Sequence, residues 1–346
     1  MKAAVLHGSK DIRYEEVKKP KIEENEVLIR VEATGICGSD HPRVLADAAH
    51  YYPIILGHEF SGKIVEIGKN VDKLKKGDRV AGAPLIPCHN CPDCIQGNYS
   101  QCSNYSFIGS RQAGSWAQYV KLPAVNAVKL PEEVSYLQGA FFEPATVGLH
   151  ALFIMNFQGG RDVAVIGAGT IGLLAMQCAR ALGAKRIFAF DIDEKRLEVA
   201  AEYGADFCIN TEKEGFKEKV EKETEGRGLP VVLECAGVEF TEKLSLELAA
   251  NKGKVMFIGT PARAITLTPG EFENINRKEL MVRGSWMSYS APFPGEEWEL
   301  AGYYFKKNKI KIEKLLDRII PLKEIGQAFS DIEEGKVKGK IILQDI

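Results

Sequence analysis

Short runs with β-type hydrophobic patterning dominate the first 150 residues of the chain. They are rich in branched apolar residues and are bounded by Gly, Pro or charged residues: EVLIRVEATG (26–35), GKIVEIG (62–68), DRVAGAP (78–84) and AQYVKLP (117–123). This spacing predicts a compact, mostly antiparallel, barrel-like domain. Residues 287–346 return to a mixed pattern that ends in GKIILQDI, and we expect them to belong to the same domain.

Between residues 151 and 286 the pattern changes to apolar strands that alternate with amphipathic helices. The expected strands are DVAVIGAG, RIFAFDID, VVLECAG and KVMFIGT, and the expected helices are TIGLLAMQCARALGA, DEKRLEVAAEYGA and TEKLSLELAANKG. Strands that alternate with helices of this length predict βαβ units and a parallel sheet. The sequence therefore predicts an α/β protein with two domains, which also fits a length of 346 residues.

Composition excludes several classes of function. The chain has 45 basic and 47 acidic residues, a formal net charge of -2, so nothing indicates binding to nucleic acid or to an anionic membrane. We also expect no membrane span, because the longest apolar stretch, near residues 163–179, contains three glycines. The N-terminal apolar run is too short for a signal peptide, and we expect a cytoplasmic protein.

Four of the eight cysteines fall within fifteen residues. Cys88, Cys91, Cys94 and Cys102 form the pattern C-x2-C-x2-C-x7-C. Four thiolates in one loop can surround a tetrahedral zinc ion, and four protein ligands leave no position for substrate. We therefore expect a structural zinc in a lobe spanning residues 86–103; an iron–sulfur centre and unpaired or redox-active cysteines are the alternatives.

A second set of metal-binding residues is dispersed along the first domain. Cys37 lies in TGICGSD, His58 and Glu59 in GHEFSG, and Glu143 in EPATVGLH. One thiolate, one imidazole and one carboxylate with an open position are typical of a catalytic zinc site. Because a second bound carboxylate would weaken Lewis acidity, we expect only one of the two glutamates to bind zinc directly at a time. The sequence leaves open which one it is.

The segment GAGTIG fits the dinucleotide-binding pattern G-x-G-x-x-G, directly after an expected strand and at the start of an expected helix. Asp191 ends the next strand, 19 residues after Gly172, where a carboxylate can bind ribose hydroxyls and repel a 2′-phosphate. This favours NAD over NADP, although Arg196 offers a partner for a 2′-phosphate. The expected cofactor-binding residues are Gly167, Gly169, Thr170, Ile171, Gly172, Asp191 and Arg196.

Together and in this order, these motifs resemble the zinc-dependent medium-chain dehydrogenases over essentially the whole chain. The resemblance implies a GroES-like catalytic domain (residues 1–150 and 287–346), a Rossmann domain (residues 151–286), NAD, and two zinc ions per chain. It also implies that EPATVGLH belongs to the polyol branch, where Glu143 takes a place held by cysteine in simple alcohol dehydrogenases.

Longer segments, among them AHYYPIILGHEFSG and GSWMSYSAPFPGEEW, are similar to members of this family that act on polyol phosphates. The similarity implies NAD-dependent oxidation of galactitol 1-phosphate to L-tagatose 6-phosphate by a homodimer or homotetramer. Arg43 and Arg111 are the candidates to bind the phosphate, and surface or inter-domain ion pairs are the alternative role for them.

Ser39 is the candidate to accept the proton of the substrate hydroxyl; the alternative is that it caps a helix. Many family members have a relay histidine at the position of Pro42. His41, beside it, either replaces the relay or faces solvent, and we expect solvent. The family's polyol dehydrogenases also often carry an arginine near the position of Met287.

Several other activities use the same zinc and NAD motifs. Sorbitol or xylitol, butanediol and L-threonine are the alternative substrates. A catalytically silent relative that binds a dinucleotide is the non-enzymatic alternative, but such a protein is expected to lack a zinc ligand or a glycine of the turn. All of these residues are present.

Overall fold

The computed structural model describes residues 1–346, which divide into two compact units. Unit one consists of Met1–Glu143, Tyr289–Lys307 and Ile312–Ile346, and unit two consists of Pro144–Ser288 and Asn308–Lys311. The chain therefore leaves the first unit, completes most of the second, and returns. None of the helices has the length and apolar character needed to cross a membrane.

Unit one is built on a seven-stranded sheet in the order β16-β17-β3-β4-β5-β9, with β8 paired to β3. All pairings are antiparallel except that of β16 with β17, so the predicted mostly antiparallel sheet is present. The strands of this sheet are β3 (Glu26–Gly35), β4 (Glu59–Ile67), β5 (Arg79–Gly82), β8 (Tyr119–Pro123), β9 (Ala127–Lys129), β16 (Leu316–Pro321) and β17 (Lys340–Gln344).

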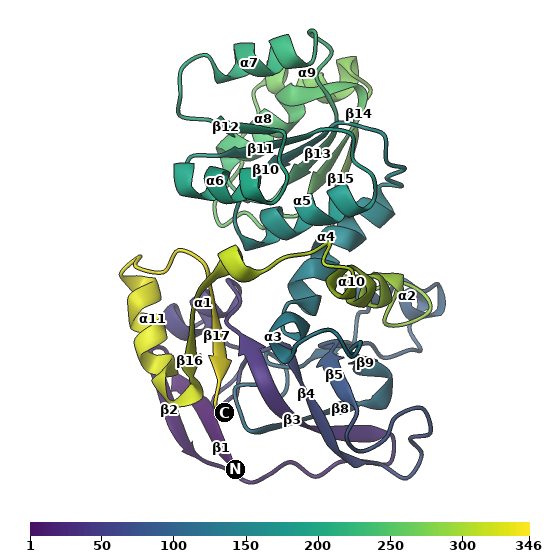
Figure 1. The fold of residues 1–346 in the computed structure, drawn as a ribbon, viewed down its shortest axis with the longest axis vertical. Helices are drawn as coiled ribbons and strands as arrows, with labels where there is room; N and C mark the ends of the chain where they lie inside the picture. The colour runs from purple at the N-terminus through teal and green to yellow at the C-terminus, as the bar shows by residue number, and fades with distance from the viewer. The chain divides into compact units, whose positions relative to one another are not determined.

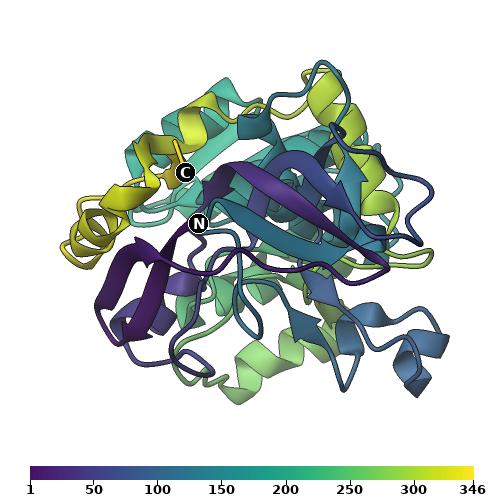
Figure 2. The same cartoon turned by 90° about the horizontal axis from the view of Figure 1, so that it is seen from below.

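Two small hairpins accompany this sheet: β1 (Lys2–Gly8) with β2 (Asp11–Glu16), and β6 (Leu85–Ile86) with β7 (Ser106–Phe107). Figures 1 and 2 place the β1–β2 hairpin and the segment around helix α2 at opposite edges of the unit. The helices that begin in unit one are α1 (Asp40–Leu45), α2 (Pro92–Ile95), α3 (Tyr136–Gly139), α4 (Phe142–Ile154), α10 (Glu296–Lys306) and α11 (Ile325–Glu333).

Unit two contains a six-stranded, fully parallel sheet in the order β12-β11-β10-β13-β14-β15. This strand order is that of the doubly wound dinucleotide-binding fold. The strands are β10 (Val163–Ile166), β11 (Ile187–Asp191), β12 (Phe207–Asn210), β13 (Leu229–Glu234), β14 (Ala249–Phe257) and β15 (Met281–Gly284). The helices are α5 (Thr170–Ala181), α6 (Glu194–Glu202), α7 (Phe216–Glu223), α8 (Glu239–Leu248) and α9 (Pro269–Arg277).

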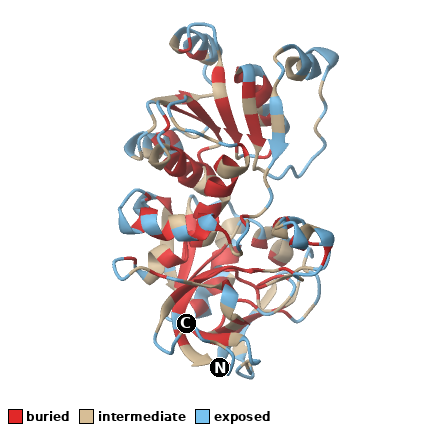
Figure 3. Ribbon diagram, turned by 90° about the vertical axis from the view of Figure 1, so that its right-hand side faces the viewer, coloured by how far each residue is buried: buried red, intermediate tan, exposed pale blue.

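The sequence pattern placed one helix end wrongly. Residues 249–253 were expected to continue the helix TEKLSLELAANKG, but α8 ends at Leu248 and these residues begin β14. The ammonium of Lys278 binds the carbonyls of Leu246, Glu247 and Ala249 and so satisfies the end of α8. Figure 3 shows that the inner strands of the parallel sheet are buried, whereas the edge strand β15 is largely exposed.

Candidate active site and metal centres

The end of strand β3 and the start of strand β4 bring three expected zinc ligands together. Gly35, the last residue of β3, pairs with Glu59, the first residue of β4. Cys37 follows the one strand and His58 precedes the other, and the ligand atoms of Cys37, His58 and Glu59 all lie within 4.8 Å of one another. A Cβ atom at Gly35 would lie 2.2 Å from the Glu59 carboxylate, so this close approach requires glycine.

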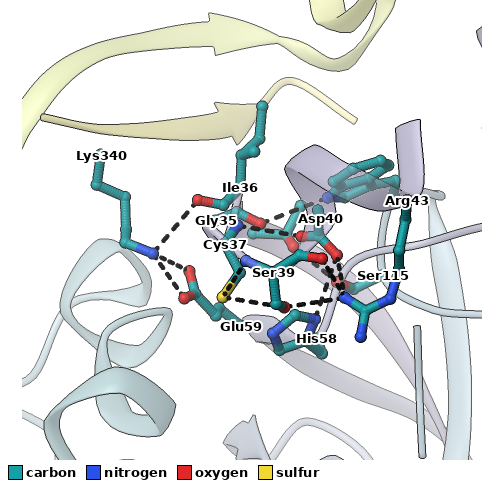
Figure 4. A network of polar contacts seen from close by, with 12 residues as sticks. Gly35, Ile36, Cys37, Ser39, Asp40, Arg43, His58, Glu59, Ser115 and Lys340 are labelled. Carbon is teal, nitrogen blue, oxygen red and sulfur yellow. Dashed lines mark hydrogen bonds and ion pairs between the residues drawn. The ribbon is translucent and has the colours of Figure 1, made fainter. Parts of the chain in front are cut away.

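Two charged residues that were absent from the expected site complete this cluster. Lys340, the first residue of β17, places its ammonium 2.6 and 2.5 Å from the two carboxylate oxygens of Glu59. On the other side, the fully buried Asp40 accepts a hydrogen bond from the Cys37 backbone N–H (3.1 Å) and lies 3.7 Å from Nδ1 of His58. Figure 4 shows the cysteine sulfur between these two arms.

The Lys340–Glu59 pair determines the charge of the site. Burial lowers the pKa of Lys340, but the charges of Glu59 and Cys37 outweigh that effect and the net pKa lies above its ordinary value. Lys340 is 6% exposed and Glu59 1% exposed, so each charge depends on the other for stabilisation. The ammonium therefore neutralises Glu59 inside the cluster.

Ser39 and Arg43 lie beside the same sulfur. The Ser39 hydroxyl donates to Sγ of Cys37 at 3.3 Å, and Arg43 donates to the Ser39 hydroxyl at 2.9 Å and to Oδ1 of Asp40 at 3.2 Å. Ser39 is the N-cap residue of α1, yet its side chain makes no capping hydrogen bond. The hydroxyl is therefore directed to the metal-binding residues and not to the helix.

Glu143 lies in the first turn of α4, and its carboxylate is not among the ligand atoms that cluster within 4.8 Å. It is nonetheless within electrostatic range, because burial, opposed by His58 and assisted by Glu59, raises the pKa of Glu143 to about 7. Burial and the charge of Glu59 also raise the pKa of the Cys37 thiol. A divalent cation would reverse both shifts by favouring the anionic forms.

The residues of this cluster fit a zinc ion. Nδ1 of His58 is buried without a hydrogen-bond partner, which is costly for a polar atom unless a ligand satisfies it. A thiolate, an imidazole and a carboxylate are donor types that zinc accepts, and three protein ligands leave one position for substrate. His58, Cys37 and Glu59 are thus the residues that would hold the ion.

The second cluster consists of the four closely spaced cysteines. Cys91 caps α2, Cys94 lies within it, and Cys102 follows a short 3-10 helix, so two tight turns direct the sulfurs inward. The ligand atoms of Cys88, Cys91, Cys94 and Cys102 lie within 4.8 Å of one another, and none forms a disulfide. A compact set of four free thiols fits a tetrahedral zinc site with no open position.

Backbone groups and neighbouring thiols shift the pKa values of two of these cysteines, Cys91 and Cys94. The N–H of Cys94 is the largest cause that lowers the pKa of Cys91, to about 6, whereas burial and hydrogen bonds to Cys91 and Cys102 raise that of Cys94 to about 12. The pKa values of these two thiols thus depend mainly on burial, backbone N–H groups and the neighbouring thiols.

Within unit two, the glycines of GAGTIG occupy the turn between β10 and α5. Gly167 has a φ of 94°, and a Cβ atom at Gly172 would lie 1.8 Å from the carbonyl oxygen of Gly167. By contrast, nothing lies within 4 Å of a Cβ placed on Gly169. The first and third glycines are therefore needed for the turn and its packing, and the second leaves open space where a pyrophosphate can approach. Thr170 and Ile171 form the first turn of α5.

Asp191 ends β11 and faces the same turn. Its Oδ2 accepts a hydrogen bond from the Ala168 N–H at 2.7 Å, and its Oδ1 accepts one from the Asp193 N–H at 2.9 Å. Arg196, from α6, lies 3.7 Å from Oδ2 of Asp191. The arginine is thus paired with the carboxylate that was expected to repel a 2′-phosphate.

The remaining candidate residues lie as follows. Arg111 places its guanidinium 4.5 Å above the Tyr105 ring and donates to its hydroxyl at 3.3 Å. His41 was expected to face solvent, but it is half-buried with its ring against Phe329, because α1 packs on α11. Met287 adopts a left-handed conformation with φ of 58°.

Comparison with known families matches both parts of the chain. Residues 23–132 match the alcohol dehydrogenase GroES-like domain, and residues 170–301 match the zinc-binding dehydrogenase domain. The first match covers the strands that position Cys37, His58 and Glu59, together with the four-cysteine lobe. The second begins at Thr170, within the dinucleotide-binding motif.

Individual relatives cover nearly the whole chain. Galactitol 1-phosphate 5-dehydrogenase of Escherichia coli (strain K12) is 42% identical over 344 residues, 99% of each chain. The crystal structure of galactitol-1-phosphate dehydrogenase from Escherichia coli superposes with a TM-score of 0.96 at 42% identity, covering 99% of this chain and all of that one. A putative zinc-binding dehydrogenase from Sinorhizobium meliloti 1021, bound to NADP, matches with a TM-score of 0.89 at 30% identity, covering 99% and 98% of the two chains. The chain therefore belongs to the zinc-dependent medium-chain dehydrogenase family and is an oxidoreductase.

Proposed function

We propose that the chain oxidises galactitol 1-phosphate to L-tagatose 6-phosphate with NAD and binds two zinc ions, one catalytic and one structural. The observation that carries the proposal is the 42% identity to galactitol 1-phosphate 5-dehydrogenase over 99% of both chains. The site supports it, because an oxidisable alcohol needs a Lewis acid, a proton acceptor and a hydride acceptor. Residues of the cluster around Cys37 are proposed to hold the Lewis acid and to supply the proton acceptor.

In this proposal Cys37, His58 and Glu59 hold the catalytic zinc, and Glu143 does not bind it directly. Zinc at this position would supply the Lewis acidity that lowers the pKa of the substrate hydroxyl. Lys340 offsets the charge of Glu59, so the cluster keeps a carboxylate ligand without becoming more negative. Glu143, half-buried and with a pKa raised to about 7, is suited to contact the open position or the substrate.

Ser39 is proposed to accept the substrate proton. Its hydroxyl lies 3.3 Å from the Cys37 sulfur and accepts a hydrogen bond from Arg43 at 2.9 Å. As the serine oxygen takes up the substrate proton, its own hydroxyl proton must pass outward to solvent, so the oxygen keeps no net charge; the hydrogen bond from Arg43 holds the hydroxyl in place. Asp40 and Arg43 fix the position of this hydroxyl, because both belong to the same short helix.

The hydride acceptor is proposed to be NAD, held at the turn from Gly167 to Gly172. Oδ1 and Oδ2 of Asp191 are within reach of the turn and of α6, where an adenosine ribose is expected in this fold. The ion pair with Arg196 reduces the availability of that arginine for a 2′-phosphate. An Asp191→Ser variant is expected to gain activity with NADP, relative to NAD, when initial rates are compared.

Arg43 and Arg111 are proposed to bind the substrate phosphate. Both act on His50, whose pKa is lowered by burial and then by the charges of Arg111 and Arg43, which supports their being near one another. The two arginines and the metal ligands all belong to unit one.

The test is NADH absorbance with galactitol 1-phosphate, sorbitol, xylitol, 2,3-butanediol and L-threonine as parallel substrates. We expect strong preference for the phosphorylated polyol, and an increase in its KM in Arg43→Ala and Arg111→Ala. Arg30→Ala is the control, because Arg30 is exposed and pairs only with Glu32. Turnover of an unphosphorylated substrate alone would refute the phosphate assignment, and no turnover by zinc-loaded protein would favour a silent relative.

We also propose a cytoplasmic homodimer, with a homotetramer as the alternative. Strand β15 pairs only with β14, and its other edge presents unpaired backbone groups. Met281 in β15 and Trp286 just after it are each more than half exposed, a feature typical of surfaces that bind another chain. Light scattering of wild type and Met281→Lys is expected to give a dimer and a monomer, respectively.

A further inference from the structure

A polar cavity lies at the amino-terminal ends of the strands of the parallel sheet in unit two. It has a volume of about 660 Å³ and is lined by the turns that precede β10, β11 and β13 and by the first residues of β14. The dinucleotide-binding turn follows the carboxyl end of β10, so it lies at the other ends of the strands. The cavity is therefore separate from the proposed cofactor site.

Basic side chains outnumber acidic ones around this cavity. Two acids line it, and each already has a basic partner: Asp162 pairs with Arg186 at 2.5 Å, and Glu247 pairs with Lys217 at 2.7 Å. The lining includes five basic residues, which are Arg161, Lys185, Arg186, Arg227 and Lys278. In a chain with a net charge of -2, this is a local positive excess.

Three of these cations have a structural role. Lys278 donates to carbonyls at the end of α8, Arg186 to the carbonyl of Glu223 at the end of α7, and Arg227 to that of Thr224. The last carbonyls of a helix lack partners within the helix, and cations near them are stabilising. The structural role of these three residues therefore explains their position without a ligand.

Arg161 and Lys185 differ from those three. Both are exposed, and neither side chain forms a hydrogen bond or ion pair within the chain. The Lys185 N–H donates to the Arg161 carbonyl at 2.8 Å, which fixes the two residues side by side on neighbouring turns. Two adjacent cations that satisfy no carbonyl and no carboxylate repel each other, and an anion would remove that repulsion.

We propose that this cavity binds a small anion that carries two or more phosphate groups, the chemistry shared by ADP and inorganic pyrophosphate. Arg161 and Lys185 would contact the phosphates, with the unused donors of Arg186 and Arg227 around them. The volume is within the range of small-molecule sites and exceeds what a single phosphate needs.

The proposal is tested by isothermal titration of the zinc-loaded protein, saturated with NAD, with pyrophosphate and separately with ADP. NAD saturation keeps ADP out of the cofactor site, and zinc content is measured afterwards because pyrophosphate chelates metals. We expect binding to wild type and about tenfold weaker binding in Arg161→Ala and in Lys185→Ala, since each loses a charged donor to phosphate. Lys219→Ala, which removes an exposed cation of α7 outside the cavity, should leave the affinity unchanged.

Binding of ADP alone or of pyrophosphate alone, weakened by both cavity variants, supports the site and identifies the source of the phosphates. Absence of binding to wild type overturns the proposal. So does equal weakening in Lys219→Ala, because that result would indicate a non-specific charge effect. Dehydrogenase activity without added anion should be the same in all variants, which verifies that each is folded.

Discussion

The two cysteine-containing clusters of unit one, each of which could hold a metal ion, are assembled in opposite ways. In the lobe, four thiols of one short segment lie within 4.8 Å of one another. The other cluster combines a cysteine, a histidine and a glutamate from the ends of two paired strands. Local turns suffice for the first cluster. The second depends on the register of β3 with β4 and on β17, whose first residue neutralises Glu59.

We expect the two clusters to serve different purposes, one stability and the other reactivity. In the lobe, four thiols would fill every position around a metal, and burial, backbone N–H groups and neighbouring thiols have the largest effects on the pKa values of Cys91 and Cys94. In the other cluster, Asp40, Arg43, Lys340 and Glu143 surround three ligands and adjust their charge. We expect damage to the first cluster to reduce mainly stability, and damage to the second to reduce mainly turnover.

The largest expected effect is on turnover, in Cys37→Ser. Loss of the thiolate would remove a zinc ligand, and the Lewis acidity of a bound zinc ion lowers the activation barrier by several kcal/mol. We therefore expect kcat/KM to fall by at least about a thousandfold, with little change in Tm. Steady-state kinetics and calorimetry measure both, and Cys208→Ser, at a half-buried cysteine outside both clusters, is the matched control. Retention of activity would show that this cluster is not catalytic.

The next largest effect is expected for Lys340→Met, which tests the buried ion pair between Lys340 and Glu59. Removing one partner of a buried ion pair leaves Glu59 uncompensated, which is expected to cost about 3–5 kcal/mol of unfolding free energy. Chemical denaturation measures the loss. The double variant Glu59→Gln/Lys340→Met should recover much of that stability while remaining inactive. If the single variant is as stable as wild type, Glu59 is not charged in the folded protein.

For the lobe, Cys91→Ser should reduce unfolding free energy by about 2–3 kcal/mol, since a bound structural metal contributes to folding. In a chain of 346 residues that corresponds to a decrease in Tm of about 3–4 °C. The kcat of the folded fraction should stay near the wild-type value. A loss of kcat as large as that of Cys37→Ser, with Tm unchanged, would reverse the roles assigned to the two clusters.

The smallest effect is expected for Asp40→Asn. This change keeps the shape of a residue that contacts the Cys37 backbone and lies 3.7 Å from His58, but removes its charge. Loss of such an outer partner is expected to weaken zinc binding at the catalytic cluster about 10- to 100-fold and to leave the lobe unaffected. Competition with a zinc chelator measures both sites. Equal weakening at both would mean that Asp40 acts on the fold and not on the metal.

Sequence patterns predicted the parts of this molecule that are encoded locally. Alternating strands and helices predicted the parallel sheet, and short polar-bounded strands predicted the antiparallel one. Lys340 was not predicted, because it is 281 positions from Glu59 and reaches it only through the pairing of β17 with β3. The contact of the half-buried His41 with Phe329 was not predicted, since no local pattern shows that α11 packs against α1. Partners that depend on strand order and helix docking carry no signal in the sequence around them.

The most direct test of the two-centre account is the zinc content of purified wild type, Cys37→Ser and Cys91→Ser, measured together with activity. We predict two zinc ions per wild-type chain and one in each variant, with activity abolished only in Cys37→Ser. One zinc in wild type that disappears in Cys91→Ser, with unchanged activity, would contradict the account, because the cluster of Cys37, His58 and Glu59 would then not hold the catalytic metal.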